Sequence, residues 1–112
     1  MPQVKVKNSD VYYREWGSGN VATVLVLHGW GVDSSQYEQM GPLLAENEYH
    51  VVVPDLPGWG NTPAPTKAWS VSDYIEWVHE FALTLNFKNF TLFGHSFGGR
   101  VAIKYAVKYP ND

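Results

Sequence analysis

Apolar residues in this chain are grouped in short runs that predict the strands of a sheet. Residues 24–27 and 51–53 are apolar at every position, which is typical of strands buried on both faces, and residues 90–93 predict a third such strand. Around residues 4–6 apolar and polar positions alternate, and residues 11–13 begin another apolar run after a polar turn. We expect these first two strands to pair antiparallel.

Helical spacing of apolar residues predicts three helices between and after the buried strands. The first begins at Ser34 or Ser35, ends near Asn47 and is kinked or shortened by Pro42. The second follows Ser70, which with Asp73 forms a capping-box pattern. Its expected inward stripe comprises Val71, Tyr74, Ile75, Val78, Phe81, Ala82 and Leu85.

The third helix is expected over residues 97–109, with Pro110 ending it. Its expected inward residues are Val101, Ala102, Tyr105 and Ala106. The predicted order is therefore β-β-β-α-β-α-β-α, which indicates the α/β class, with a mostly parallel sheet and helices on both faces. We find no internal repeat or linker and interpret residues 1–112 as one domain.

Composition narrows the function classes without choosing one. The chain has 112 residues, 45% of them hydrophobic, which is typical of a globular domain. Its net charge is −3 and it has no Lys/Arg patch, so we expect no nucleic-acid partner. It has no cysteine, no signal-peptide pattern and no apolar stretch approaching the ~20 residues of a membrane span. We expect a cytoplasmic protein without metal, cofactor or membrane association.

The strongest chemical signal is the sequence Gly94-His95-Ser96-Phe97-Gly98-Gly99. It contains G-x-S-x-G between a predicted buried strand and a predicted helix, where a sharp turn exposes the serine hydroxyl. Small residues at Gly94 and Gly98 let neighbouring backbones approach, and the helix directs its free N–H groups at the reacting centre. The alternative is an ordinary glycine-rich turn whose serine caps the helix.

Two further loops follow predicted strands. His28-Gly29-Trp30-Gly31 comes after the first buried strand, where a backbone N–H can bind an oxyanion. We assign the two donors to Trp30 and Phe97; the alternative is a turn with a buried aromatic side chain. Asp55 opens a glycine-rich stretch after the second buried strand, and we expect it to hold that loop through backbone N–H groups.

These three motifs, in this order and spacing, resemble the serine-nucleophile branch of the α/β-hydrolase fold family. The resemblance covers essentially the whole chain and implies the N-terminal part of that fold, with about five strands and three helices. The lipase form His-Gly-Gly-Gly is absent, so the chain is more similar to small esterases, carbon–carbon-bond hydrolases and haloperoxidase-like members. Dehalogenases and epoxide hydrolases of this fold use Asp where this chain has Ser96, which argues against both activities.

A base for Ser96 is missing from the sequence. In the family the order is Ser, then Asp or Glu, then His, whereas no His follows Ser96 here and its only later acid is Asp112. The four histidines all precede Ser96: we expect His28 to be structural, His50 to begin a strand, His79 to face solvent and the side chain of His95 to point away from Ser96. We interpret the chain as a partial domain without the later strands, the cap, the triad acid and the His.

The resulting hypothesis is a hydrolase of ester or similar acyl substrates that is inactive as this chain. We also expect self-association through the unpaired edge of the strand at residues 90–94. The alternative is a binding module that kept the fold without catalysis. A dinucleotide-binding domain is disfavoured, because a strand rather than a helix follows the G-x-G-x-x-A pattern of residues 17–22.

Overall fold

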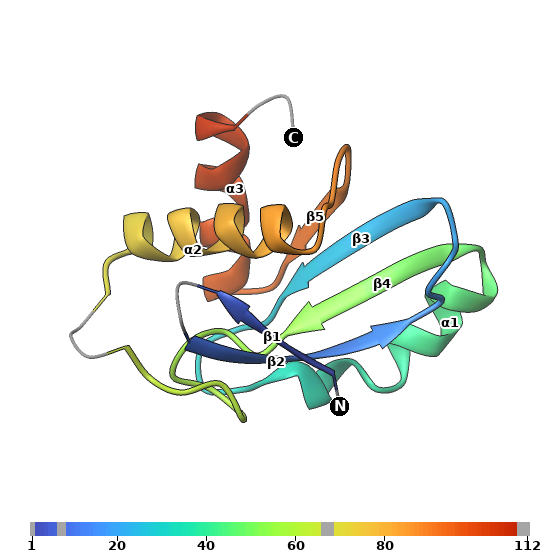
Figure 1. Cartoon of the computed structure of the whole chain (residues 1–112), viewed down its shortest axis with the longest axis horizontal. Coiled ribbons are helices and arrows are strands. Elements are labelled where there is room, and N and C mark those ends of the chain that lie inside the picture. Colours follow the sequence, from blue (N-terminus) through green and yellow to red (C-terminus); the bar gives the residue numbers. More distant parts are fainter. Residues whose placement is uncertain (1, 7–8, 66–68, 110–112) are drawn as a thin grey trace.

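The computed structural model describes residues 2–6, 9–65 and 69–109. It contains a five-stranded sheet in the order β1-β2-β4-β3-β5 (Figure 1). The strands are β1 (Gln3–Val6), β2 (Ser9–Trp16), β3 (Ala22–Leu27), β4 (Tyr49–Pro54) and β5 (Thr91–Gly94). β1 pairs antiparallel with β2, and β3 pairs parallel with both β4 and β5. The predicted α/β class and antiparallel first pair are confirmed.

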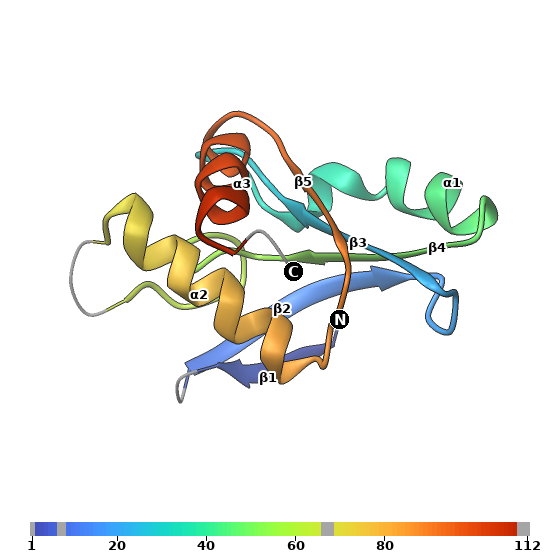
Figure 2. The ribbon, with the colours of Figure 1, turned by 90° about the horizontal axis from the view of Figure 1, so that it is seen from above.

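Helices cover both faces of this sheet, as predicted (Figures 1 and 2). Alternate residues of β3 point to opposite sides: Leu25 and Leu27 pack under α2 (Val71–Thr84) and α3 (Phe97–Lys108), and Val24 and Val26 pack with residues of α1 (Met40–Glu46). Each of these four side chains is at most 8% exposed. The apolar run therefore serves two separate cores, which is why it lacks alternation.

The first predicted helix is divided in two. A 3₁₀-helix, η1 (Ser34–Tyr37), precedes α1, and its N-cap is Asp33, whose carboxylate accepts from the Ser35 amide at 2.9 Å. The prediction of Ser34 or Ser35 as the cap is wrong, because Asp33, just before them, caps the 3₁₀-helix. Pro42 lies in the first turn of α1, where a missing N–H breaks no helical hydrogen bond.

The other two helices agree with prediction except at single positions. Ser70 and Asp73 form the predicted capping box of α2. Trp77 is buried although it lies outside the predicted stripe, where it stacks on Phe81 at 5.3 Å. Ala106 is exposed, not inward-facing, because the buried face of α3 centres on Val101 and Tyr105. None of the helices in the described ranges is long and apolar enough to cross a bilayer.

The described sheet ends at β5, whose neighbour is β3 and whose Phe93 side chain is 44% exposed. Edge strands offer unpaired N–H and C=O groups to a second chain. We therefore expect the 112-residue polypeptide to sediment partly as dimers or larger species at high micromolar concentration. Phe93→Lys should shift it toward monomer, whereas Val21→Lys, at a 99% exposed site off this edge, should not. A monomeric wild type would contradict the prediction.

Candidate active site

Ser96 lies at a sharp turn between β5 and α3. Its φ is 57° and its ψ is −115°, a left-handed backbone that residues other than glycine seldom adopt. Its hydroxyl makes no hydrogen bond that caps the helix, and the residue is exposed. The helix-capping interpretation is therefore wrong. The chain holds this serine in a strained conformation without using its side chain structurally.

Glycines bring three backbone segments together around this turn. A Cβ at Gly98 would overlap the carbonyl of Leu27, and one at Gly94 would overlap the carbonyl of Gly98. A Cβ at Gly29 would lie 3.3 Å from His95 Nδ1, so the loop after β3 also packs directly against the serine turn. The prediction that small residues allow close backbone approach is confirmed.

The amides of Trp30 and Phe97, the expected oxyanion donors, make no backbone hydrogen bond within the described ranges. Phe97 is the first residue of α3, where an amide has no partner within the helix. Among the hydrogen bonds of the described residues, none uses the amide of Trp30. The Trp30 side chain is 62% exposed, so the alternative of a turn around a buried aromatic residue is wrong.

His28 is buried and both of its ring nitrogens are engaged. The Leu56 amide donates to Nε2 at 2.9 Å, which assigns the proton to Nδ1, and Nδ1 lies 2.8 Å from the Gly29 carbonyl oxygen. Burial lowers the pKa of His28. The expected structural role is confirmed: this imidazole joins the loop after β3 to the loop after β4.

The lowered pKa of His28 predicts that the chain loses stability as the pH falls. The unfolded state takes up the proton near pH 6.5, before the folded state does, so stability is fully present above that pH and decreases below it. We expect the unfolding free energy in urea to fall by up to about 1.4 kcal/mol per pH unit below pH 6.5.

His28→Gln should flatten this pH dependence between pH 7.5 and 5.5, whatever its effect on stability at pH 8. His95→Gln, which changes an exposed histidine, is the matched control and should keep the wild-type slope. An unchanged slope in His28→Gln would show that another group binds the proton.

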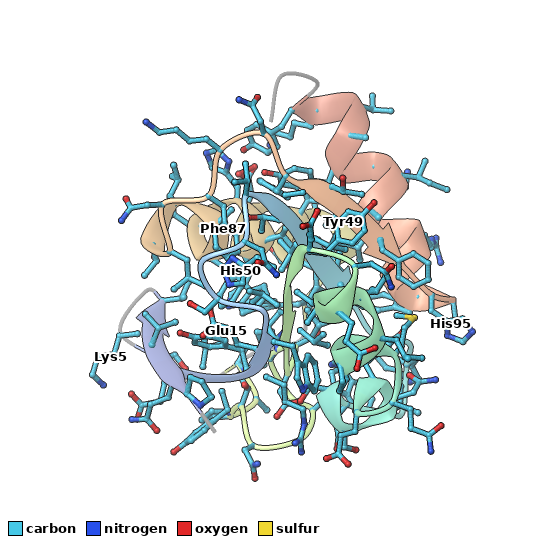
Figure 3. The ribbon with its side chains drawn as sticks, turned by 90° about the vertical axis from the view of Figure 1, so that its right-hand side faces the viewer. Lys5, Glu15, Tyr49, His50, Phe87 and His95 are labelled. Carbon is cyan, nitrogen blue, oxygen red and sulfur yellow. The ribbon has the colours of Figure 1, made fainter. Side chains whose placement is uncertain are left out.

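The other three histidines lie in different surroundings. His95 is exposed, and Figure 3 shows its side chain at the periphery, remote from His50 and Glu15. Nε2 of His50 lies 2.6 Å from a Glu15 carboxylate oxygen near the start of β4. His79 is half-buried and stacks on Tyr109 at 4.1 Å, which corrects the expectation that it faces solvent.

Asp55 holds the loop after β4, as predicted. Its carboxylate is 1% exposed and accepts from the amides of Ser34 at 2.8 Å and Asn61 at 3.0 Å. One side chain therefore fixes its own loop and the start of η1. No group of three or more histidine, cysteine or acidic residues within the described ranges is arranged to hold a metal ion.

Aromatic rings from the loop after β3, from the segment between β4 and α2, from α2 and from α3 meet beside Ser96. The Trp30 ring contacts Trp59 at 4.6 Å and Phe97 at 5.0 Å between centroids, both edge-on. Phe97 also contacts Tyr74 of α2 at 5.2 Å, and Tyr74 contacts Trp69 at 5.1 Å. We call these five residues the aromatic cluster. Helical spacing placed Tyr74 in the core, but no pattern in the sequence signals its contact with Phe97.

Comparison with known proteins identifies the family. The family model that describes the sequences of the alpha/beta hydrolase fold matches residues 22–112 of this chain. The chain belongs to this family. It is 33% identical over 102 residues to an uncharacterized hydrolase of Saccharomyces cerevisiae, covering 90% of this chain and 35% of that protein. It is 35% identical over 97 residues to a monoacylglycerol lipase of Xenopus laevis, covering 84% of this chain and 28% of the lipase.

Among solved structures, this α/β-hydrolase chain is similar to the crystal structure of a membrane phospholipase A, described as a bacterial virulence factor. The TM-score is 0.92 with 35% identity, and the match covers 97% of this chain and 35% of that one. The chain thus spans about one third of the proteins it matches. The shared region contains the serine turn and the loops after β3 and β4.

Proposed function

We propose that this chain carries the nucleophile part of a serine-hydrolase site for ester or similar acyl substrates, with Ser96 as the nucleophile. The observation that carries the proposal is the backbone of Ser96, held at φ 57° with a hydroxyl free of any capping bond. A backbone strained in this way costs on the order of 1–3 kcal/mol, and such conformations cluster at functional sites. A monoacylglycerol lipase and a phospholipase A among the similar proteins support an acyl substrate.

The proposed chemistry begins with attack of Ser96 Oγ on the substrate carbonyl carbon. The amides of Trp30 and Phe97 donate to the oxygen that becomes negative, and the N-terminus of α3 stabilises the same charge. Collapse of the intermediate expels the alcohol and leaves an acyl-serine, which water then hydrolyses. Gly94, His95 and Gly98 shape the turn, and His28 and Gly29 support the donor loop.

A base must take the proton of Ser96 in the first step and a proton of the attacking water in the second. The ring nitrogens of His28 are occupied, and the side chains of His50 and His79 contact Glu15 and Tyr109 instead. His95 is the neighbour of Ser96, and adjacent side chains at such a turn point apart, so we infer that none of the four histidines is the base. The second candidate, a binding module without catalysis, shares the fold but gives no reason for the strained, uncapped serine.

A fluorophosphonate probe with imidazole as external base distinguishes the two. Ser96 Oγ forms a bond to phosphorus, fluoride leaves, and imidazole takes the proton, so one adduct per chain needs no internal base. We expect peptide mapping to find the adduct at Ser96, with a rate that rises with imidazole concentration. Ser96→Ala should lose it, whereas Ser72→Ala, at an exposed position on α2, should not. Labelling of Ser96 no faster than of the other serines would favour the binding module.

A further inference from the structure

The peptide that carries the Trp30 amide is held at its carbonyl end, where His28 Nδ1 lies 2.8 Å from the Gly29 oxygen. Trp30 lies between Gly29 and Gly31, and Gly31 has a φ of 82° that few other residues adopt. No backbone hydrogen bond within the described ranges fixes the Trp30 N–H. On the other side of this peptide the Trp30 ring is available as a second constraint, and catalytic hydrogen bonds lose their effect when displaced by about 1 Å.

Two rings supply that constraint, and one of them belongs to the loop after β4. Phe97 is itself the second proposed donor, so its contact with Trp30 joins the two donors through their own side chains. Trp59 contacts Trp30 at 4.6 Å from another side. Trp59 thus connects the donor loop to a segment that contributes no atom to the proposed reaction.

Trp59 is suited to this role because its own backbone is fixed. Its amide donates to the Leu56 carbonyl at 2.9 Å, and its carbonyl accepts from the Thr62 amide at 3.1 Å. The Tyr74 hydroxyl donates to the Pro57 carbonyl at 3.0 Å, which joins this turn to α2. Burial raises the pKa of that hydroxyl, and an interaction with the Trp59 indole, short of full hydrogen-bond geometry, offsets part of the rise.

We propose that Trp59 is a positioning residue of the oxyanion site: its ring holds the Trp30 ring against Phe97 and thereby places the Trp30 amide. This inference rests on the proposed function of Ser96. It assigns the aromatic residue of the glycine-rich loop after β4 a role in transition-state stabilisation in addition to packing. Loss of the ring leaves the Trp30 side chain with Phe97 as its remaining partner in the aromatic cluster.

The experiment measures fluorophosphonate labelling of Ser96, with imidazole, in four forms of the 112-residue chain. Trp59→Ala should slow labelling at least about tenfold, because displacing one of two donors removes much of the oxyanion stabilisation. Trp59→Phe restores an edge contact and should stay within about threefold of wild type. Trp16→Ala is the matched control, since Trp16 packs against the other core, with Met40 and Leu44, and should also stay within about threefold.

A second readout reports on the Trp30 amide without any reaction. In ¹H–¹⁵N spectra, Trp59→Ala should shift the Trp30 amide signal and speed its exchange with solvent, and Trp59→Phe should restore most of the wild-type behaviour. Should Trp59→Ala fail to fold by circular dichroism, Trp59→Leu removes the ring while keeping apolar volume and replaces it in both measurements.

The outcomes separate the two proposals. If wild-type Ser96 is labelled and a folded Trp59→Ala is labelled at the same rate, the positioning role is overturned and the proposed function stands. If wild-type Ser96 is not labelled, the proposed function fails. An unchanged Trp30 amide signal in Trp59→Ala overturns the positioning role in either case.

Discussion

The 112-residue polypeptide is expected to hydrolyse p-nitrophenyl acetate, without imidazole, within about threefold of the rate of its Ser96→Ala variant. Attack by Ser96 requires removal of its proton, and the resulting acyl-serine requires activation of water. No His follows Ser96 in the sequence, and the ring nitrogens of His28 are both engaged. An acyl group that does reach Ser96 should remain there, so the chain releases at most one equivalent of product.

The expected loss of hydrolysis rate, relative to a complete serine hydrolase, is large. Removing a triad member leaves roughly 10³–10⁴ over the uncatalysed reaction, through oxyanion stabilisation and binding. Complete enzymes reach roughly 10⁶–10¹⁷. Initial rates at several protein concentrations, followed at 400 nm as is usual for nitrophenolate, give the comparison directly. A wild-type rate a hundredfold above Ser96→Ala would mean that these residues contain a base, and His95→Gln and His50→Gln would identify it.

Much of the fold could be predicted because its signals are local. Unbroken apolar runs indicated strands between two helical layers, and β3 does serve two cores. The capping box at Ser70 and Asp73 involves residues three positions apart, so the sequence contains all of it. The same locality explains the error at Ser34: Asp33 offers a competing cap one residue earlier, and propensity alone ranks the two types equally.

The candidate site could be predicted only where a sequence motif lies between a predicted strand and a predicted helix. The serine turn lies within six consecutive residues between a strand and a helix, and its strained backbone is what the glycines at either side permit. Contacts between distant segments gave no such signal. The stacking of His79 on Tyr109 and the approach of Trp59 to Trp30 depend on how α2, α3 and two loops meet in space. The spacing of apolar residues shows which side of a helix faces inward. It does not show which aromatic ring a residue on that side contacts.

Gly98→Ala is expected to destabilise the chain by about 3 kcal/mol or more, at the upper end of overpacking effects. The added methyl would overlap the Leu27 carbonyl and lie 2.6 Å from the His28 carbonyl oxygen. Both obstacles are backbone, and the Leu27 carbonyl also accepts from the His95 amide at 3.2 Å. Relief therefore requires moving α3 away from β3, which disturbs the pairing of Leu27 with Gly94. The gain in helix propensity of up to about 1 kcal/mol does not compensate.

Gly99→Ala provides the matched comparison, because it adds the same methyl to the next residue of the same helix. There the nearest obstacle is the Gly94 carbonyl oxygen at 3.1 Å, which a small adjustment relieves. We expect its unfolding free energy in urea to stay within about 1 kcal/mol of wild type, since helix propensity offsets the tight contact. Equal stabilities for the two variants would show that α3 can shift on the sheet. The serine turn would then owe its strained backbone to something other than the close approach of Gly98 to β3.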